Sequence, residues 1–362
     1  MEIVITIVAF LLIFGLLIFV HELGHFLVAR RNGIKVEEFG FGLPLLPRIF
    51  SVQRGETTYS IYPVPLGGFV KMLGEDGHAR KNKRSFASKS MGVRARVLVA
   101  GVAMNALLAY VLLTAGFLFK MPPIALCPAD IPNVSFDSTV TVAAITADSP
   151  ATRAGLKVGD DITKIGTTDI ACGQQVPQTL QQSPGRPVQM QITRNGQPQT
   201  VTVTPGASGT ATAGKIGIAP ADIFSKLDYP LWEAPIIAGA EMVAITSVTV
   251  AAIGDIFVKL FTTASIPPGV AGPVGIAKLT GDAVALGPLV VLRFIAIISL
   301  SLAIFNLLPI PALDGGRLLF VGIEALRRGR KVSAKVEQAI HAAGFFALIA
   351  LILVITYFDL TR

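Results

Sequence analysis

The chain has 362 residues, of which 52% are hydrophobic and only 15% are charged. Soluble domains carry about 25% charged residues, so this composition excludes an ordinary soluble protein and indicates membrane spans with some soluble mass attached. The net charge of +8 could suggest nucleic acid binding. However, basic residues are in excess only in residues 30–96 and 317–335, and not in residues 120–287. The positive-inside rule places the first two segments in the cytoplasm and the third outside, so the charge reports topology and we expect no nucleic acid partner.

The first apolar segment, residues 3–29, contains the sequence His-Glu-Leu-Gly-His near its end. On a helix this spacing places His21 and His25 one turn apart on one face, where both can bind one zinc ion. Glu22 between them can take a proton from the attacking water. Because the helix is apolar on all sides, we expect this chemistry inside the bilayer. The positive charges follow the apolar run instead of preceding it, which favours a retained span with its N-terminus outside over a cleaved signal peptide.

Catalytic zinc sites combine three protein ligands with an open position, so a third ligand is needed at membrane depth. The best candidate is Asp314, in Asn-Leu-Leu-Pro-Ile-Pro-Ala-Leu-Asp-Gly-Gly at 306–316. The prolines break the helix, and a buried carboxylate there is costly unless it is paired or bound to a metal. The alternatives are a chance His-Glu-x-x-His match and a loop acid that ends a helix. Asn105 is a candidate for the site or for a bridging amide between packed helices, and both readings stay open.

Three further stretches are predicted to span the membrane, residues 97–119, 288–308 and 339–358. A basic amphipathic segment is expected at 80–96 and a basic cytoplasmic loop at 317–335. His341, near the start of the last span, is expected to be interfacial and not a ligand.

Residues 234–261 are also apolar but carry Glu241, Asp255 and Lys259. If this segment crossed the membrane, Asp314 would end on the face opposite to His25. We therefore predict four spans and place amphipathic helices over residues 225–285 on the outer surface.

Residues 36–75 are strand-like and rich in glycine and proline. Such backbone is tolerated at membrane depth only where protein or a water-filled cavity shields it. A β-hairpin beside the active site fits this pattern, and its edge near Gly67 and Gly68 could hold an unwound substrate strand by β-augmentation.

A soluble α+β module is expected over residues 125–220, because short β-branched runs alternate there with turn sequences. Its Ser-Pro-Ala-x-x-Ala-Gly-Leu-x-x-Gly-Asp-x-Ile sequence resembles a bacterial PDZ domain. Ile216, Gly217 and Ile218 are the candidates for its carboxylate-binding loop. Cys127 and Cys172 both lie outside, where a disulfide is compatible with the compartment, but two isolated cysteines leave the bond open.

Together these features resemble the site-2 protease family of intramembrane zinc metalloproteases, closest to the bacterial regulator-of-sigma-E protease type but with a single PDZ domain. The motifs that carry the resemblance occur in the family's order: His-Glu-Leu-Gly-His at 21–25, Gly-x-x-x-Asn at 101–105, the PDZ-like module, Gly-Pro-Val-Gly-Ile at 272–276, and the Asp314 motif at 306–316. The implied fold is an α-helical membrane protein of about four transmembrane helices with a membrane-associated β-hairpin and one inserted PDZ domain. The resemblance implies Zn²⁺ bound by His21, His25 and Asp314, Glu22 as the base, and Asn306 and Pro311 as residues that help to position the substrate strand.

The same resemblance implies regulated intramembrane proteolysis in a bacterial cytoplasmic membrane. A site-1 type protease first trims a single-pass membrane protein outside, and this enzyme then cuts the remaining transmembrane helix near the cytoplasmic side. Anti-sigma factors and signal peptide remnants are the implied partners, and the termini and the PDZ domain are expected outside. A membrane scaffold, a metal transporter and a prenyl-protein endopeptidase are alternatives. The intact His-Glu-x-x-His argues against a scaffold, and the lack of internal repeats argues against a transporter. The PDZ-like module argues against a prenyl-protein endopeptidase.

Overall fold

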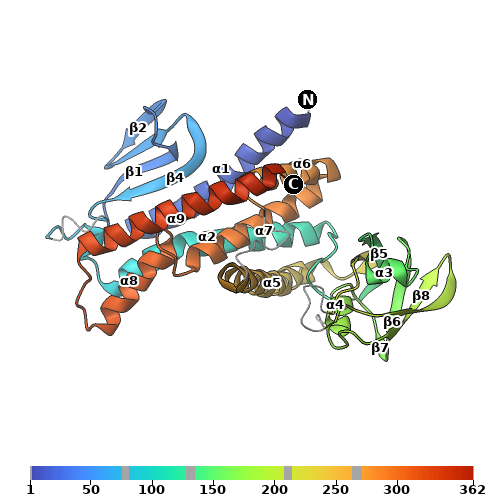
Figure 1. Ribbon diagram of the computed structural model, residues 1–362. Helices are drawn as coiled ribbons and strands as arrows, with labels where there is room; N and C mark the ends of the chain where they lie inside the picture. The colour runs from blue at the N-terminus through green and yellow to red at the C-terminus, as the bar shows by residue number, and fades with distance from the viewer. Residues whose placement is uncertain (1, 76–80, 128–134, 208–213, 263–270, 362) are drawn as a thin grey trace. The chain divides into compact units, whose positions relative to one another are not determined.

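The computed structural model describes residues 2–75, 81–127, 135–207, 214–262 and 271–361 (Figure 1). The chain divides into two compact units, one formed by residues 1–116 and 245–362 and the other by residues 117–244. The first unit holds most of the apolar helices and a four-stranded sheet. The second unit holds a six-stranded sheet.

Apolar helices dominate the first unit. They and the short helices beside them are α1 (Glu2–Arg31), η1 (Phe86–Ser88), α2 (Met91–Leu118), α5 (Ala234–Thr262), α6 (Pro273–Leu286), α7 (Pro288–Leu307), α8 (Asp314–Leu326) and α9 (Ala334–Thr361), of which α2 and α5 run across the boundary into the second unit. Within the described ranges, five helices are long and apolar enough to cross a membrane: α1, α2, the segment Leu231–Ile256, α7 and α9. The sequence predicts four of these as membrane spans. The fifth candidate lies mostly in α5, which is one continuous helix of 29 residues.

The start of α2 corrects the sequence analysis. The structure has turns and the single-turn η1 in the first part of the expected amphipathic segment 80–96, and α2 begins at Met91, six residues before the predicted span. Its first turns can carry charge at this depth because Arg94 donates two hydrogen bonds of 2.7 Å to the carboxylate of Glu324 on α8. Both side chains are buried, and a buried charge is tolerated when it is paired in this way.

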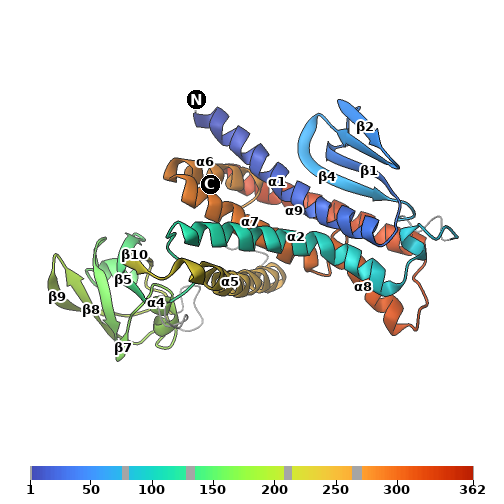
Figure 2. The same cartoon turned by 180° about the vertical axis from the view of Figure 1, so that it is seen from behind.

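Helices α1 and α2 converge toward the end of α1 and the start of α2 (Figure 2), and their backbones come into close contact there. A Cβ atom on Gly24 would lie 2.3 Å from the carbonyl oxygen of Ala100, so no residue with a side chain fits at this crossing. Around it Leu17, Ala29 and Val97 are completely buried. The glycine inside the His-Glu-Leu-Gly-His motif therefore sets how closely α2 approaches the two histidines.

The predicted β-hairpin of residues 36–75 is wrong in extent, because this region forms a four-stranded sheet. Its strands are β1 (Val36–Leu43), β2 (Phe50–Arg54), β3 (Thr57–Ile61) and β4 (Val64–Met72), in the order β2-β3-β1-β4. Strands β2 and β3 form a hairpin, β3 pairs parallel with β1, and β1 pairs antiparallel with β4. Strand β4 is thus an edge strand, and it packs along α1.

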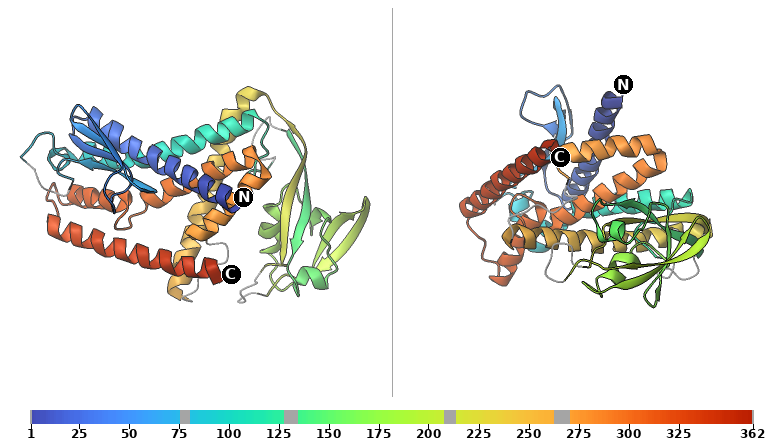
Figure 3. Two further views of the ribbon diagram at one scale, coloured as in Figure 1. Left: turned by 90° about the horizontal axis from the view of Figure 1, so that it is seen from above. Right: turned by 45° about the vertical axis from the view of Figure 1, so that its right-hand side comes forward.

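The last helices close the first unit. Helix α6 packs against α1, α7 and α9, and Figure 3 shows this group from two further directions. The end of α9 lies beside the start of α6, where the carboxylate of Asp359 accepts a hydrogen bond of 2.8 Å from the Gly275 amide. The start of α9 lies beside the loop that follows α7, because Gly344 contacts Pro311. Helix α9 therefore runs antiparallel to α7.

The second unit is an α+β module. Its elements are β5 (Ser135–Ile145), α3 (Pro150–Arg153), β6 (Asp161–Ile165), β7 (Thr168–Asp169), α4 (Gln175–Leu180), β8 (Val188–Arg194), β9 (Gln197–Val203), β10 (Ile218–Asp228) and η3 (Leu231–Glu233). The strand order is β10-β5-β6-β8-β9, with β7 paired to β6. Buried Val142, Ile162, Met190 and Ile192 form the core. Strand β10 extends the module past residue 220, the end predicted from the sequence.

Two local features of the module follow directly from its sequence. Ser149 caps α3, because its hydroxyl accepts a hydrogen bond from the Thr152 amide. Asn195 and Gly196 both have positive φ angles, 51° and 77°, as the type I′ turn of a tight hairpin requires.

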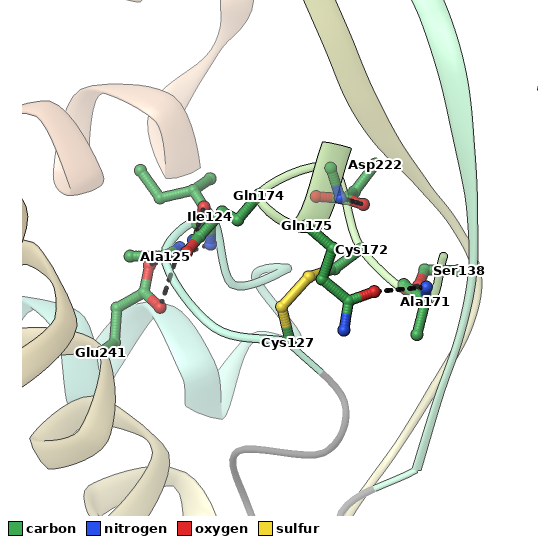
Figure 4. The surroundings of a disulfide bond; sticks show 11 residues. Ile124, Ala125, Cys127, Ser138, Ala171, Cys172, Gln174, Gln175, Asp222 and Glu241 are labelled. Carbon is green, nitrogen blue, oxygen red and sulfur yellow. Dashed lines mark hydrogen bonds between the residues drawn. A yellow bond between two sulfur atoms is a disulfide. The ribbon is translucent and has the colours of Figure 1, made fainter. Parts of the chain in front are cut away.

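The cysteine pair is bonded in the structure, which settles the alternative left open by the sequence. Figure 4 shows Cys127 joined to Cys172, 45 residues further along the chain. Nearby, the carboxylate of Glu241 accepts hydrogen bonds from the amides of Ile124 and Ala125. The disulfide and this carboxylate together fix the segment that leads from α2 into the module.

Arg194 donates two hydrogen bonds, of 2.6 and 2.7 Å, to the buried carboxylate of Asp160. We predict that Arg194→Leu destabilises the module, because it leaves this buried carboxylate unpaired. Hydrogen exchange of β6 and β8 amides in the full-length protein measures this. Lys164→Met, which removes an exposed pair with Asp169, serves as the control and should cost less than about 1 kcal/mol.

The same pair predicts a pH dependence. The hydrogen bonds from Arg194 hold the pKa of Asp160 below its usual range. A lowered pKa in the folded state stabilises the module fully above the unfolded value of about 3.9, and the stabilisation is lost as the pH falls through the folded value. Protection in wild type and Arg194→Leu should therefore converge in acid. Equal protection at neutral pH would contradict the assignment.

Candidate metal centre

Three side chains from two distant parts of the chain meet at one point in the first unit. The Nε2 atoms of His21 and His25 lie 3.1 Å apart, and each lies 3.1 Å from Oδ2 of Asp314. The donor atoms that these three residues offer all lie within 4.8 Å of one another. Their side chains are between 8% and 18% exposed, so water does little to separate them.

The geometry of these three atoms suits zinc. Zinc bonds of about 2.0–2.1 Å in tetrahedral geometry separate neighbouring donor atoms by about 3.3 Å. A triangle with sides of 3.1 Å therefore matches one face of such a tetrahedron and leaves the fourth corner free. Two imidazoles and one carboxylate are also the ligand types of catalytic zinc sites.

The tautomer of His25 is fixed by a contact outside the triangle. Its Nδ1 lies 2.8 Å from the carbonyl oxygen of Val97 on α2, in a buried position. A carbonyl can only accept, so Nδ1 carries the proton and Nε2 presents a lone pair toward Asp314. Hydrogen bonds of this kind orient metal-binding histidines.

Gly101 makes room for the two histidines. A Cβ atom at this position would lie 2.4 Å from Nε2 of His25 and 2.8 Å from Nε2 of His21. Any side chain here would occupy the space where the donor atoms converge. Gly101 is the first residue of the Gly-x-x-x-Asn motif, in which the sequence identifies only Asn105 as a candidate site residue.

A cavity of about 200 Å³ adjoins the three donors. Glu22 lines it together with Phe69 and Val70 of β4, and Ala312 and Arg317 lie on its other side.

The other predicted site residues differ in how close they lie to this cavity. A Cβ atom on Gly68 would lie 3.3 Å from Cγ of Glu22, so the β4 backbone passes directly over the candidate base. Gly67 has a φ of 115° and contacts Leu43 instead. Asn306 ends α7 eight residues before Asp314, outside the set that lines the cavity.

Asn105 is buried to 1% exposure, and both polar atoms of its amide have no hydrogen-bond partner among the described residues. Its backbone carbonyl accepts a hydrogen bond of 2.8 Å from the Ser299 hydroxyl. The bridge between α2 and α7 is therefore made by the backbone of this residue, and its amide group remains available.

Comparison with known proteins agrees with this centre. The model of peptidase family M50 matches residues 9–351. A relative from Clostridium acetobutylicum is 36% identical over 357 aligned residues, which cover 98% of this chain and 97% of the relative. The chain belongs to peptidase family M50.

Two further relatives carry more specific names. A protein of Geobacillus kaustophilus named zinc metalloprotease RasP is 30% identical over 442 aligned positions, covering 99% of this chain and 98% of the relative. The regulator of sigma-W protease RasP of Bacillus subtilis is 29% identical, with the same two shares. Family M50 comprises the site-2 proteases. This M50 member is accordingly a Zn²⁺ metalloendopeptidase of the intramembrane type, which excludes the scaffold, transporter and prenyl-protein endopeptidase alternatives.

We predict that Gly101→Ala weakens zinc binding at least tenfold, because its methyl group would displace the histidine nitrogens. Gly92→Ala on the same helix is the matched control, since a Cβ atom there meets nothing within 4 Å. Competition with a fluorescent chelator measures both affinities in the purified protein. Wild-type affinity in Gly101→Ala would show that the donors do not converge beside α2.

Proposed function

We propose that this M50 protease cleaves the transmembrane segments of single-pass membrane proteins. In this proposal His21, His25 and Asp314 hold the Zn²⁺ ion and Glu22 is the general base. The observation that carries it is the triangle of two imidazole nitrogens and one carboxylate oxygen, beside Glu22 on a helix that is long and apolar enough to cross a membrane.

When bound, the Zn²⁺ ion supplies a Lewis acid for the scissile carbonyl and the attacking water. Glu22 lines the adjoining cavity and faces no fixed cation there except Arg317, which itself pairs with Glu75. It is therefore free to accept the proton of the attacking water and to pass it to the leaving amine.

The substrate would bind as an extended strand. A transmembrane helix hides its carbonyl groups in its own hydrogen bonds, so it must unwind before it can be cut. Strand β4 is an edge strand whose backbone passes over Glu22 at Gly68. Its outer edge could pair with the unwound substrate by β-augmentation, which holds the scissile bond near the base. Gly67, Asn105, Asn306 and Pro311 are further candidates for contacts with this strand.

The contacts of the first unit support four spans. His25 lies in the last third of α1, close to Arg30 and Arg31, and Asp314 follows the end of α7. Because His25 and Asp314 touch, α1 and α7 must run in the same direction. Helix α2 returns outward between them, so α5 cannot cross the membrane alone. In this proposal the active site lies near the cytoplasmic side.

The rest of the topology follows from that direction. The charged ends Arg94 and Arg96 of α2 and the basic turn between α8 and α9 lie on the cytoplasmic side with Arg30. Helix α9 then runs outward, so both termini and the module between α2 and α5 lie outside a bacterial cytoplasmic membrane.

The module would serve as a PDZ domain. Strand β10 lies at the edge of its sheet and can accept an added peptide strand. The candidate carboxylate loop precedes it: Ile216 is 2% exposed and its carbonyl accepts the Ala151 amide, while Gly217 has a φ of 80°. This domain either receives a newly made C-terminus or excludes substrates with large outer domains.

The names of the relatives indicate which substrate class and which partner proteins to propose for this chain. Proteins named RasP and regulator of sigma-W protease suggest an anti-sigma factor as the substrate of this chain too. Signal peptide remnants are the second substrate class. In either case a site-1 type protease would trim the outer domain first.

We predict that Glu22→Gln retains zinc but loses cleavage by a factor of at least about 10³, because the amide cannot accept the proton. Zinc content by mass spectrometry and turnover of a trimmed single-pass substrate in proteoliposomes measure the two properties. Glu56→Gln, which breaks only an exposed pair with Arg84, is the control and should leave both unchanged. Turnover near the wild-type rate would remove Glu22 from the role of base.

Replacing residues 128–228 with a short flexible linker separates the two roles of the module. A size filter predicts that substrates with intact outer domains become cleavable. A receptor predicts that trimmed substrates are cut more slowly while untrimmed ones stay intact. Unchanged cleavage of both substrates would contradict both roles.

A further inference from the structure

His341 lies near the start of α9, where the sequence predicts an interfacial residue. Its ring contacts the loop that carries Asp314. Its Nδ1 atom lies 2.9 Å from the backbone nitrogen of Ala312, two residues before the candidate ligand. A backbone N–H can only donate, so Nδ1 is the acceptor and the ring proton is on Nε2.

The Ala312 backbone needs such a partner. Its φ angle is 80°, in the left-handed region that an alanine rarely adopts because its Cβ atom is crowded there. A residue persists in this conformation only when its surroundings fix it. The neighbouring amides are held within the loop itself, because Leu313 donates to the carbonyl of Ile310 and Gly316 donates to that of Leu313. The Ala312 amide is instead held by a side chain from another helix.

The same face of α9 makes a second contact with this loop. Gly344 lies three residues after His341, and a Cβ atom there would be 2.4 Å from Cβ of Pro311 and 2.7 Å from its carbonyl oxygen. The backbone of α9 therefore touches the loop directly. On the other side, the ring of Phe320 from α8 lies 5.5 Å from the imidazole, which fixes its orientation.

We propose that His341 is a positioning residue for the metal centre. By accepting the Ala312 amide, it holds the Pro311–Asp314 turn in the left-handed conformation that brings Oδ2 of Asp314 to the two histidine nitrogens. His341 does not touch the metal, and its effect passes through the backbone. The inference rests on the proposed function, because it requires Asp314 to be a ligand.

The test compares three full-length variants by their zinc affinity, measured from the metal-free protein with a competing fluorescent chelator. His341→Phe keeps a planar ring but removes the acceptor, and we expect zinc to bind at least tenfold more weakly. His341→Asn places an amide oxygen near the position of Nδ1, and we expect an affinity within about threefold of wild type. Asp314→Ala removes the ligand itself and should bind zinc more weakly than either.

Each result has a distinct meaning. If Asp314→Ala binds zinc like wild type, the ligand assignment fails and the proposed function fails with it. If Asp314→Ala is weakened but His341→Phe is not, the ligand assignment stands and the role of His341 is overturned. Equal weakening in His341→Phe and His341→Asn would also overturn it, because the acceptor would then be irrelevant. Gel filtration confirms folding, and His341→Met replaces the phenylalanine variant if that variant does not fold.

Discussion

Two imidazoles and one carboxylate occupy a single small space among apolar helices. The arrangement of the helices in the first unit depends on maintaining this space. Polar groups buried at membrane depth are costly unless each has a partner. Here the three donor atoms stand 3.1 Å apart, close enough to share one cation as their partner. A centre of this kind tolerates little displacement, so the helices around it must be fixed closely.

Backbone contacts help to fix the space in which the donors meet. The carbonyl of Val97 orients His25, and the contact between Gly24 and Ala100 sets the distance from α1 to α2. Gly101 leaves the space in which the donors converge. Such contacts resist motion better than long side chains do, because little conformational freedom is lost in making them. Strand β4, the proposed substrate-binding edge, also packs directly against α1.

The local part of this centre could be predicted from the sequence, and the non-local part could not. His21, Glu22 and His25 follow from the helical repeat, and Asp314 stands out because prolines and glycines surround an acid in an apolar region. The parallel pairing of β1 with β3 joins strands separated by a hairpin, so residues 36–75 could not be distinguished from a simple hairpin. The contact of His341 could not be predicted for a similar reason, since its partner Ala312 lies 29 residues earlier, in a turn whose left-handed alanine has no sequence signature. Gly101 belongs to a recognisable sequence motif. However, it leaves space for His21 and His25, which lie on α1, so its role could not be predicted from the sequence of α2.

The most direct test of intramembrane proteolysis by this centre is the position of the cut. Products of a trimmed single-pass substrate, made in proteoliposomes by the wild-type enzyme, would be sequenced by mass spectrometry. The account predicts new termini within the apolar stretch of the substrate, in its cytoplasmic half, because the proposed topology has His25 and Asp314 at that depth. Termini confined to the soluble flanks of the substrate would contradict it, because they would show that the centre acts on chains outside the bilayer.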